Sequence, residues 1–444
     1  MALFTSHLLL TFALIPPWQQ PDEHRHVAVA ELHAAQLALR IPPGPTAGSL
    51  YDPAREGELL ESMARYHWWE HRNLRGEPPW FLARDFDAAA PPIGSSDRSN
   101  ATRPTYYLVV GRLLSWLPPL SVVEDLYILR AVSAIFGILT LWIAWLGSRE
   151  CLGTLGGSTV VLLLALHPQF AIVSTAASGD ALVNLAGACL WWQATVAVKR
   201  KFTLLPIGGM WCAALIGASA DRMGIPLLAV AFVASIAAIK PYVTSRQLRT
   251  LFTRTTVVAA VASIGITAWI IDVLGGYYDL GRLLTQSLTP VPEAMTWDFF
   301  MRFTSFVHQS WWFSLGWVRY APPSWWATTA ALITMIAAIG AGRRLLQGRN
   351  FDTQTRTLIT VAATSLVVQL SAVYYVYFRF ANGAQGKSLF PVLVPCLVLL
   401  WTGIEAWVPS SRRGHAAAAL IVILALLDAT VWSLVAIPAY YASF

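Results

Sequence analysis

The sequence predicts an all-α polytopic membrane protein with about eleven transmembrane helices, and three observations lead to this prediction. The chain of 444 residues is 56% hydrophobic and only 12% charged, whereas about a quarter of the residues in soluble domains are charged. Apolar runs long enough to cross a bilayer recur from Leu126 to the C-terminus. Basic residues gather in short connectors between these runs, which is typical of cytoplasmic loops.

The apolar runs predict the spans in order. They cover residues 3–18, 126–147, 155–173, 180–198, 203–219, 223–239, 255–274, 324–341, 356–377, 388–406 and 415–437. The first run has no preceding Lys or Arg and no small-x-small cleavage site, so we interpret it as a retained short span rather than a signal peptide. With a cytoplasmic N-terminus, every basic connector falls in the cytoplasm and the C-terminus lies outside.

The net charge of +7 therefore reflects topology and does not indicate a nucleic-acid partner. The basic connectors lie near residues 199–201, 240–254, 343–356 and 412–413. The four cysteines are scattered singly in apolar segments without a CxxC pair, which favours neither a disulfide framework nor a cysteine metal site.

Two extracytoplasmic regions interrupt the apolar pattern of what we expect to be one domain, residues 1–444. The first is a loop over 18–125 with juxtamembrane helices, and the second covers 272–326. The loop opens with PDEHRHVAVAELHAAQLALR, where proline and acids precede an Ala/Leu/Val-rich stretch, a pattern typical of a helix start. At helical spacing, residues 22, 26, 29, 33, 36 and 40 form a largely polar stripe, which we expect to face water or a cavity.

Asp22 and Glu23, at the start of this helix, are the first candidate site residues. Acids in a first helical turn interact favourably with the helix dipole, and this alone explains their position. Alternatively, one of them takes a proton from an acceptor hydroxyl or holds a divalent cation, with His26 one turn further along as a second metal ligand. Composition leaves both interpretations open.

Asp180 begins the fourth predicted span at the same outer membrane face. It also suits a first helical turn. Two carboxylates that converge from separate elements are more than helix capping requires, and buried charge in membrane proteins tends to mark function. The pattern therefore favours a functional role for Asp180.

Polar residues flank a predicted helix start at the same outer face, namely Arg379, Gln385 and Lys387. This arrangement suits an anionic lipid headgroup. The alternative is a pair of cations whose side chains reach for the interface. Five tryptophans, Trp311, Trp312, Trp317, Trp325 and Trp326, are interpreted as an interfacial belt.

Two further features are left without a function. His67, Glu70 and His71 match the H-x-x-E-H metal motif, but no third ligand follows in the loop, so we interpret them as contacts of an amphipathic helix. Asp428 lies inside the last predicted span, where a hydrogen-bonded structural role accounts for it.

The ordered motifs PPWQQPDEHRH, RPTYYLVVGRLLSWL, LYILRAVSAIFGILT, HPQFAIVSTAASGDALVNL, SWWFSLGW and AQGKSLFPVLVP together resemble the GT-C superfamily of membrane glycosyltransferases. Within it, the chain is most similar to a bacterial family of predicted membrane proteins that begin with P-P-x-x-x-P-D-E-x-x-H. The resemblance covers most of the chain. One departure is Lys387-Ser388, where the family pattern leads us to expect an arginine followed by an aromatic residue.

The resemblance implies a GT-C-like fold in the plasma membrane of a bacterium, with an extracytoplasmic active site that serves the cell envelope. It also implies an inverting transfer of sugar from a polyprenyl-phosphate donor to a glycan, lipid or protein acceptor. An acid of the first loop, Asp22 or Glu23, would be the base, and Asp180 would orient it or share a divalent metal. Arg379, Lys387 and Arg222 would hold the phosphate. The alternatives are a flippase or transporter of lipid-linked saccharides and a purely structural subunit. No internal repeat, typical of many transporters, is visible.

Overall fold

The computed structural model describes residues 1–39, 53–68, 104–200, 203–243, 295–316, 320–347, 352–380 and 385–441. Within these ranges the chain is helical and contains no strand, apart from an isolated bridge between Leu315 and Tyr320. Seven of the described helical segments are long and apolar enough to cross a membrane. The predicted class, an all-α membrane protein, is confirmed at this level.

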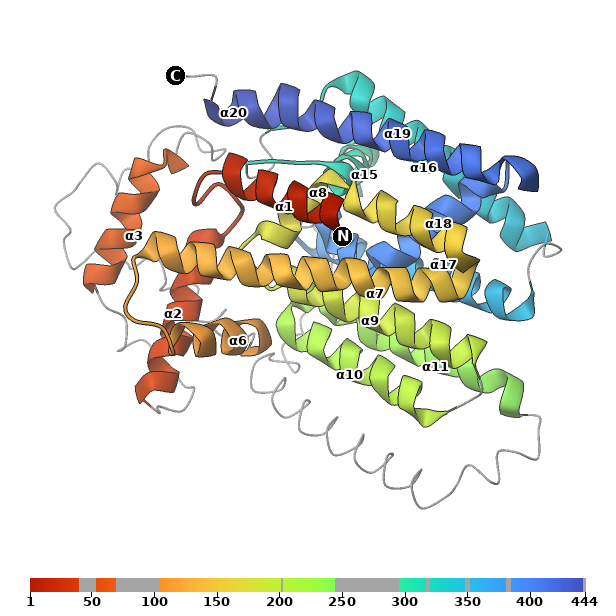
Figure 1. Cartoon of the computed structure of the whole chain (residues 1–444), viewed down its shortest axis with the longest axis horizontal. Helices are drawn as coiled ribbons and strands as arrows, with labels where there is room; N and C mark the ends of the chain where they lie inside the picture. The colour runs from red at the N-terminus through yellow and green to blue at the C-terminus, as the bar shows by residue number, and fades with distance from the viewer. Residues whose placement is uncertain are drawn as a thin grey trace, which may run out of the picture.

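The longer helices carry the fold (Figure 1). They are α1 (Ala2–Leu14), α2 (Glu23–Leu39), α3 (Pro53–Arg65), α6 (Pro104–Leu114), α7 (Val122–Ala165), α8 (Pro168–Thr175), α9 (Asp180–Lys199), α10 (Leu204–Ala220), α11 (Pro226–Val243), α15 (Trp297–Trp312), α16 (Ser324–Gln347), α17 (Thr353–Phe380), α18 (Leu393–Glu405), α19 (Arg413–Val431) and α20 (Ile437–Tyr441). Two 3₁₀ segments matter for the site, η2 (Arg222–Gly224) and η4 (Gly386–Val392).

Helix α7 contains a sharp bend at Gly153, whose φ of 75° lies in the left-handed region that favours glycine. Figure 1 shows the chain turn back there toward α8. The parts of α7 before and after the bend are in close contact, because a Cβ on Gly157 would lie 2.6 Å from the backbone of Arg149. The expected spans 126–147 and 155–173 thus lie on either side of this bend. The expected span 255–274 lies outside the described residues.

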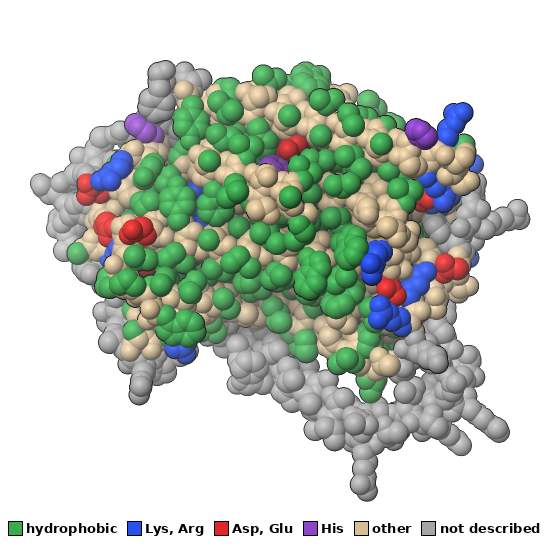
Figure 2. All heavy atoms as spheres, viewed as in Figure 1, with side chains coloured by type: hydrophobic (Ala, Val, Ile, Leu, Met, Phe, Trp, Pro, Cys, Tyr) green, Lys and Arg blue, Asp and Glu red, His purple; other side chains and the backbone are tan. Residues whose placement is uncertain are grey.

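Among the seven candidate spans, the most buried are α9 and the η4–α18 segment. The apolar window of Gly386–Glu405 is 89% buried, whereas that of α16 is only 33% buried. Outer helices expose apolar side chains, among them Phe232, Met335 and Leu426. Figure 2 shows hydrophobic side chains across the middle of the molecule, between charged groups at its two ends. Such a surface suits contact with lipid.

Small residues let α16 and α18 approach each other closely. A Cβ on Gly340 would lie 2.0 Å from the carbonyl oxygen of Gly403, and one on Gly403 would lie 1.9 Å from that of Ala337. Close backbone contact of this kind supplies the van der Waals packing that holds helices together in lipid.

Ion pairs gather at the helix ends that the sequence predicts to be cytoplasmic. Arg200 pairs with Glu150 at 3.1 Å, Lys199 with Asp352 at 3.3 Å, and Arg344 with Glu405 at 2.9 Å. These pairs join the end of α9 to the bend of α7 and to the start of α17, and the end of α16 to that of α18. The opposite ends of these helices therefore lie on the side where the candidate site is expected.

Helix α3 is anchored by Arg55, which contacts three carboxylates from three elements. Its guanidinium lies 2.8 Å from Glu31 of α2, 2.6 Å from Glu58 of α3 and 2.6 Å from Asp125 of α7. The Glu31 side chain is only 20% exposed, and burial, opposed by Arg55, raises the pKa of its carboxyl to about 7. This cluster ties the first loop to the bundle.

Two expectations about surfaces hold only in part. At the start of the polar stripe of α2, Asp22 and His26 line a cavity. Further along, His33 and Gln36 are buried, and α6 packs against α2 at Gly111, where a Cβ would lie 2.8 Å from that of His33. The tryptophans do not form a simple belt either, because Trp311, Trp312 and Trp326 are each at most 7% exposed.

Candidate functional site

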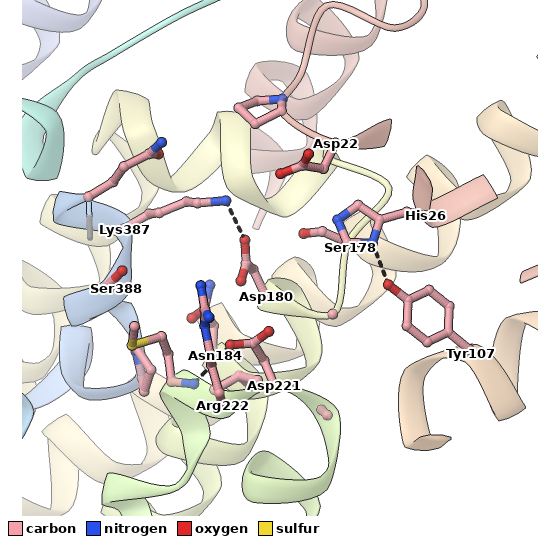
Figure 3. Close-up of a pocket in the computed structure, with 17 residues that line it drawn as sticks. Asp22, His26, Tyr107, Ser178, Asp180, Asn184, Asp221, Arg222, Lys387 and Ser388 are labelled. Carbon is pink, nitrogen blue, oxygen red and sulfur yellow. Dashed lines mark hydrogen bonds and ion pairs between the residues drawn. The ribbon is translucent and has the colours of Figure 1, made fainter. Parts of the chain in front are cut away.

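A cavity of about 180 Å³ lies where α9 begins and α10 ends, at the helix ends that the sequence predicts to be extracytoplasmic (Figure 3). Its wall is made by segments remote in sequence: the turn before α2, the start of α9, η2 and η4. Most of the site residues predicted from sequence line it, namely Asp22, His26, Asp180, Arg222, Gln385 and Lys387. The cavity therefore brings together candidates that the sequence suggested separately.

Asp22 enters the cavity from the turn that precedes α2. Its φ of 63° is left-handed, a conformation that is uncommon outside glycine but accessible to Asp and Asn. Its carbonyl oxygen accepts from the amides of Arg25 and His26, at 2.9 and 3.0 Å, and so starts the helix. The carboxylate is 41% exposed and lies 3.4 Å from the equally exposed Arg25 guanidinium, so solvent screens this pair.

Asp180 and Lys387 form an ion pair inside the cavity. Lys387 Nζ donates to Asp180 Oδ2 at 2.8 Å, and each side chain is 26% exposed. Figure 3 shows the pair between η4 and the start of α9. We predicted from the sequence that Asp180 would orient Asp22, but its carboxylate accepts a hydrogen bond from Lys387.

Close packing holds η4 in place and thereby positions Lys387. A Cβ on Gly386 would lie 1.9 Å from the backbone nitrogen of Trp311, so α15 contacts η4 where only glycine fits. The amide of Gly386 donates to Ser310 Oγ at 2.8 Å, and Gln369 Nε2 donates to the carbonyl of Ser388 at 2.7 Å. Lys387 is thus fixed from both sides along the chain.

Glu23 does not line the cavity, although it follows Asp22 directly. Its side chain is fully buried and bound by both nitrogens of one face of Arg130, from Nε to Oε1 and from Nη2 to Oε2, each at 2.7 Å. Arg130 also donates to the carbonyls of Ile15 and Pro16, both at 2.9 Å. This arrangement joins the end of α1 and the start of α2 to α7, and it occupies the carboxylate on which a catalytic role would depend.

His26 and Asp22 were the tentative metal ligands. Both line the cavity, but His26 Nδ1 is hydrogen-bonded to the hydroxyl of Tyr107 (Figure 3), and Asp180 is bound to Lys387. Among the described residues no three His, Cys, Asp or Glu side chains gather as a metal site would require. A divalent metal at this site therefore stays a prediction.

Two further residues predicted to bind the donor, Arg222 and Gln385, lie at the cavity, whereas the position of a third, Arg379, is described only for its backbone. Arg222 is exposed on η2 at the cavity wall, and Gln385 precedes η4 there. Arg379 belongs to the last turn of α17, and its side chain lies outside the described part of the chain.

Three polar lining residues, Tyr107, Asn184 and Asp221, were not among the candidates from sequence. Asn184 follows Asp180 by one helical turn and so shares its face. Asp221 lies in the next outer connector, where the argument that selected Asp180 also applies; its Oδ1 accepts from the amide of Met223 at 2.8 Å. Tyr107 comes from α6, which the sequence placed in the loop without a partner.

Two remaining candidates fall away from the site. Asp428 lies 3.3 Å from His7 Nε2 and accepts from Trp432 Nε1 at 3.1 Å, so it joins α19 to α1. His67 lies just after α3 with a φ of 51°, while Glu70 and His71 lie outside the described residues. Comparison of the chain with protein-family models, curated proteins and solved structures finds no match.

Proposed function

We propose that the protein is a GT-C-type glycosyltransferase that moves a sugar from a polyprenyl-phosphate donor to a hydroxyl of a glycan, lipid or protein at the extracytoplasmic face. One observation carries the proposal: a single cavity contains an accessible carboxylate, Asp22, together with the cations Lys387 and Arg222. This is the pair of functions that transfer from a phosphate-linked sugar needs, a base and a site for the departing anion.

In the proposed reaction the acceptor hydroxyl gives its proton to the Asp22 carboxylate. The hydroxyl oxygen forms a bond to the anomeric carbon as the bond from that carbon to the phosphate oxygen breaks. The electron pair leaves with the polyprenyl phosphate, whose added negative charge Lys387 and Arg222 stabilise. Attack opposite to the leaving group inverts the anomeric configuration.

Asp180 acts in this scheme as a positioning residue. It holds Lys387 Nζ at 2.8 Å, and an ammonium group has three protons to donate, so two remain for phosphate oxygens. Without Asp180, the lysine would lose both its counter-charge and its fixed direction. This replaces the sequence-based expectation that Asp180 orients Asp22.

The test uses the purified full-length protein in lipid nanodiscs, radiolabelled polyprenyl-phosphate sugars and a membrane extract as the acceptor source. We expect label to move from one donor to an acceptor. Asp22→Asn should lower the rate by about 10²- to 10⁴-fold, the usual contribution of general-base catalysis. Asn tolerates the left-handed backbone, so folding should persist.

The matched control is Asp298→Asn. Asp298 lies on α15, is 79% exposed, pairs with Arg302 and does not line the cavity, so its loss should leave the rate within about twofold. Transfer by Asp22→Asn at the wild-type rate would remove Asp22 from the mechanism. A labelled donor that crosses liposome membranes chemically unchanged, at equal rates in both variants, would support the flippase alternative instead.

A further inference from the structure

A second, smaller cavity of about 20 Å³ lies on the other side of the Lys387–Asp180 pair. It shares Pro21, Asp180, Gln385 and Lys387 with the main cavity. The ion pair therefore forms a common wall between two compartments. A volume of this size suits one water molecule or one hydroxyl group.

Amide side chains line the smaller compartment, namely Gln19, Gln20, Gln169 and Gln385. Gln19 is fully buried and Gln20 is 2% exposed. Gln169 is already engaged, since its Oε1 accepts from the amide of Ser314 at 2.7 Å. The other two buried glutamines are paired on one side only.

The hydrogen bonds of Gln19 and Gln20 fix the direction of each amide. Gln19 Nε2 donates to the carbonyl oxygen of Tyr66 at 2.8 Å, and a carbonyl only accepts. Gln20 Nε2 donates at 3.3 Å to Thr175 Oγ1, whose own proton goes to the α8 backbone. Both Oε1 atoms are buried without a hydrogen-bond partner among the described residues.

In the main compartment, a buried donor rather than a buried acceptor lacks a hydrogen-bond partner among the described residues. Asn184 is 4% exposed, and its Nδ2 has no acceptor in the described part of the chain. Unpaired buried polar atoms are rare in folded proteins because each one loses its hydration without a replacement. Here acceptors lack partners on one side of the ion pair and a donor lacks a partner on the other.

The unpaired acceptors and the unpaired donor suit different parts of a sugar-phosphate ligand. A phosphodiester carries acceptor oxygens and no O–H group, so it can bind Asn184, Lys387 and Arg222 but cannot satisfy an amide oxygen. A sugar hydroxyl donates a proton and can satisfy Gln19 or Gln20.

We propose that the smaller compartment is a hydroxyl-recognition subsite, in which Gln20 Oε1, supported by Gln19 Oε1, accepts from a hydroxyl of the sugar while the phosphate lies on the Asn184 side of the ion pair. This inference rests on the proposed function, because it takes the ligand to be a polyprenyl-phosphate sugar. It adds the determinant of sugar specificity, which that function leaves open.

The test measures binding by calorimetry to the purified full-length protein in detergent, with Gln20→Leu as the variant. The probes are bare decaprenyl phosphate, a panel of decaprenyl-phosphate sugars, and singly deoxygenated analogues of the tightest sugar. Gln20→Leu should lower the affinity for the tightest sugar donor about five- to tenfold, the effect of one lost hydrogen bond. The affinity for bare decaprenyl phosphate should change less than twofold.

The control is Gln36→Leu, the same substitution at a buried glutamine of α2 that lines neither cavity; it should leave both affinities unchanged. In the wild type, removal of one particular hydroxyl from the sugar donor should lower its affinity by a similar factor. In Gln20→Leu, the same removal should leave the affinity unchanged. Because the deoxygenated analogues are measured on the wild-type protein, the test stays valid even where a variant folds poorly. Without ligand, Gln20→Leu should unfold no earlier than the wild type, because leucine leaves no unpaired amide.

The subsite is overturned if no sugar donor binds more tightly than bare decaprenyl phosphate, if every deoxygenated analogue binds like its parent, or if Gln20→Leu weakens both probe classes equally. Sugar donors that follow the expected pattern without any transfer of label would leave the subsite in place and reject the transferase function.

Discussion

At the scale of single residues, two neighbouring acids at the start of α2 have unlike environments. Asp22 takes a left-handed backbone conformation and lines the cavity, whereas Glu23 is fully buried against Arg130. Their identical charge and adjacent positions give no hint of this division. It depends on Arg130, which lies far along the chain in α7 and faces the turn only after the helices pack.

Glu23→Gln should destabilise the protein strongly. The substitution leaves the guanidinium of Arg130 fully buried without its counter-charge, and breaking a buried pair in this way costs about 3–5 kcal/mol. Thermal unfolding in detergent should show a clearly lower midpoint. Asp22→Asn, the neighbouring control, should stay within about 0.5 kcal/mol of the wild type; equal stability of the two variants would refute the structural role of Glu23.

The Arg55 cluster should make stability depend on pH. The pKa of Glu31 is raised from 4.5 to about 7 by burial, so between these values the folded chain binds more protons than the unfolded chain. The free energy of unfolding therefore falls as pH rises through this window, by at most about 3 kcal/mol.

Glu31→Gln should flatten this dependence, which unfolding midpoints measured at pH 5 and pH 8 will reveal. The control is Glu61→Gln on α3, where the side chain is 68% exposed and pairs with Arg65. If the wild type and Glu31→Gln lose stability in parallel as pH rises, the carboxyl of Glu31 does not titrate in the window we assign to it.

At the scale of elements, apolar runs predict where helices lie but not which faces meet. The ends of α9, α10 and α17 fall close to the boundaries expected from sequence, because hydrophobic length and basic connectors determine them. The predicted polar face of α2 lines a cavity only at its start, because His33 packs on α6 at Gly111. A glycine in sequence does not reveal which backbone approaches it.

Gly187 couples helix packing to the site. A Cβ at this position of α9 would lie 1.8 Å from the carbonyl oxygen of Pro391 in η4, so backbone must move to admit even a methyl group. Because α9 carries Asp180 and η4 carries Lys387, that movement would pull the ion pair apart. Gly187→Ala should lower stability by about 1–3 kcal/mol and should also reduce donor binding.

Unfolding midpoints and donor affinity, measured side by side, check this prediction. The matched control is Gly208→Ala in α10, where a Cβ would meet nothing within 4 Å; it should leave affinity unchanged and raise stability slightly, since alanine favours helix over glycine. A Gly187→Ala protein that binds donor normally would show that η4 tolerates displacement.

At the scale of the whole molecule, charge separates the two ends. One end carries the ion pairs of Arg200, Lys199 and Arg344, and the other carries the cavity with its acids and cations. The sequence predicts this polarity well, because the positive-inside pattern involves many residues. It does not predict which charged side chains touch, as the pairing of Asp180 with Lys387 illustrates.

Orientation in the membrane can be tested by cysteine labelling in a background without the four native cysteines. Asp298→Cys on α15 should react with a membrane-impermeant maleimide added to intact cells. Arg412→Cys, exposed at the other end before α19, should react only after permeabilisation. The reverse labelling pattern would place the cavity in the cytoplasm and remove it from the face we assign to it.

The assembly of the cavity wall from distant segments has a consequence for biosynthesis. Asp22 is synthesised before Lys387, which follows only after α17. A nascent chain that ends before Lys387 therefore lacks the group that we expect to hold a lipid-linked phosphate. Competence for substrate should arise abruptly, once Lys387 has been added, and no fragment that ends before Lys387 should acquire it.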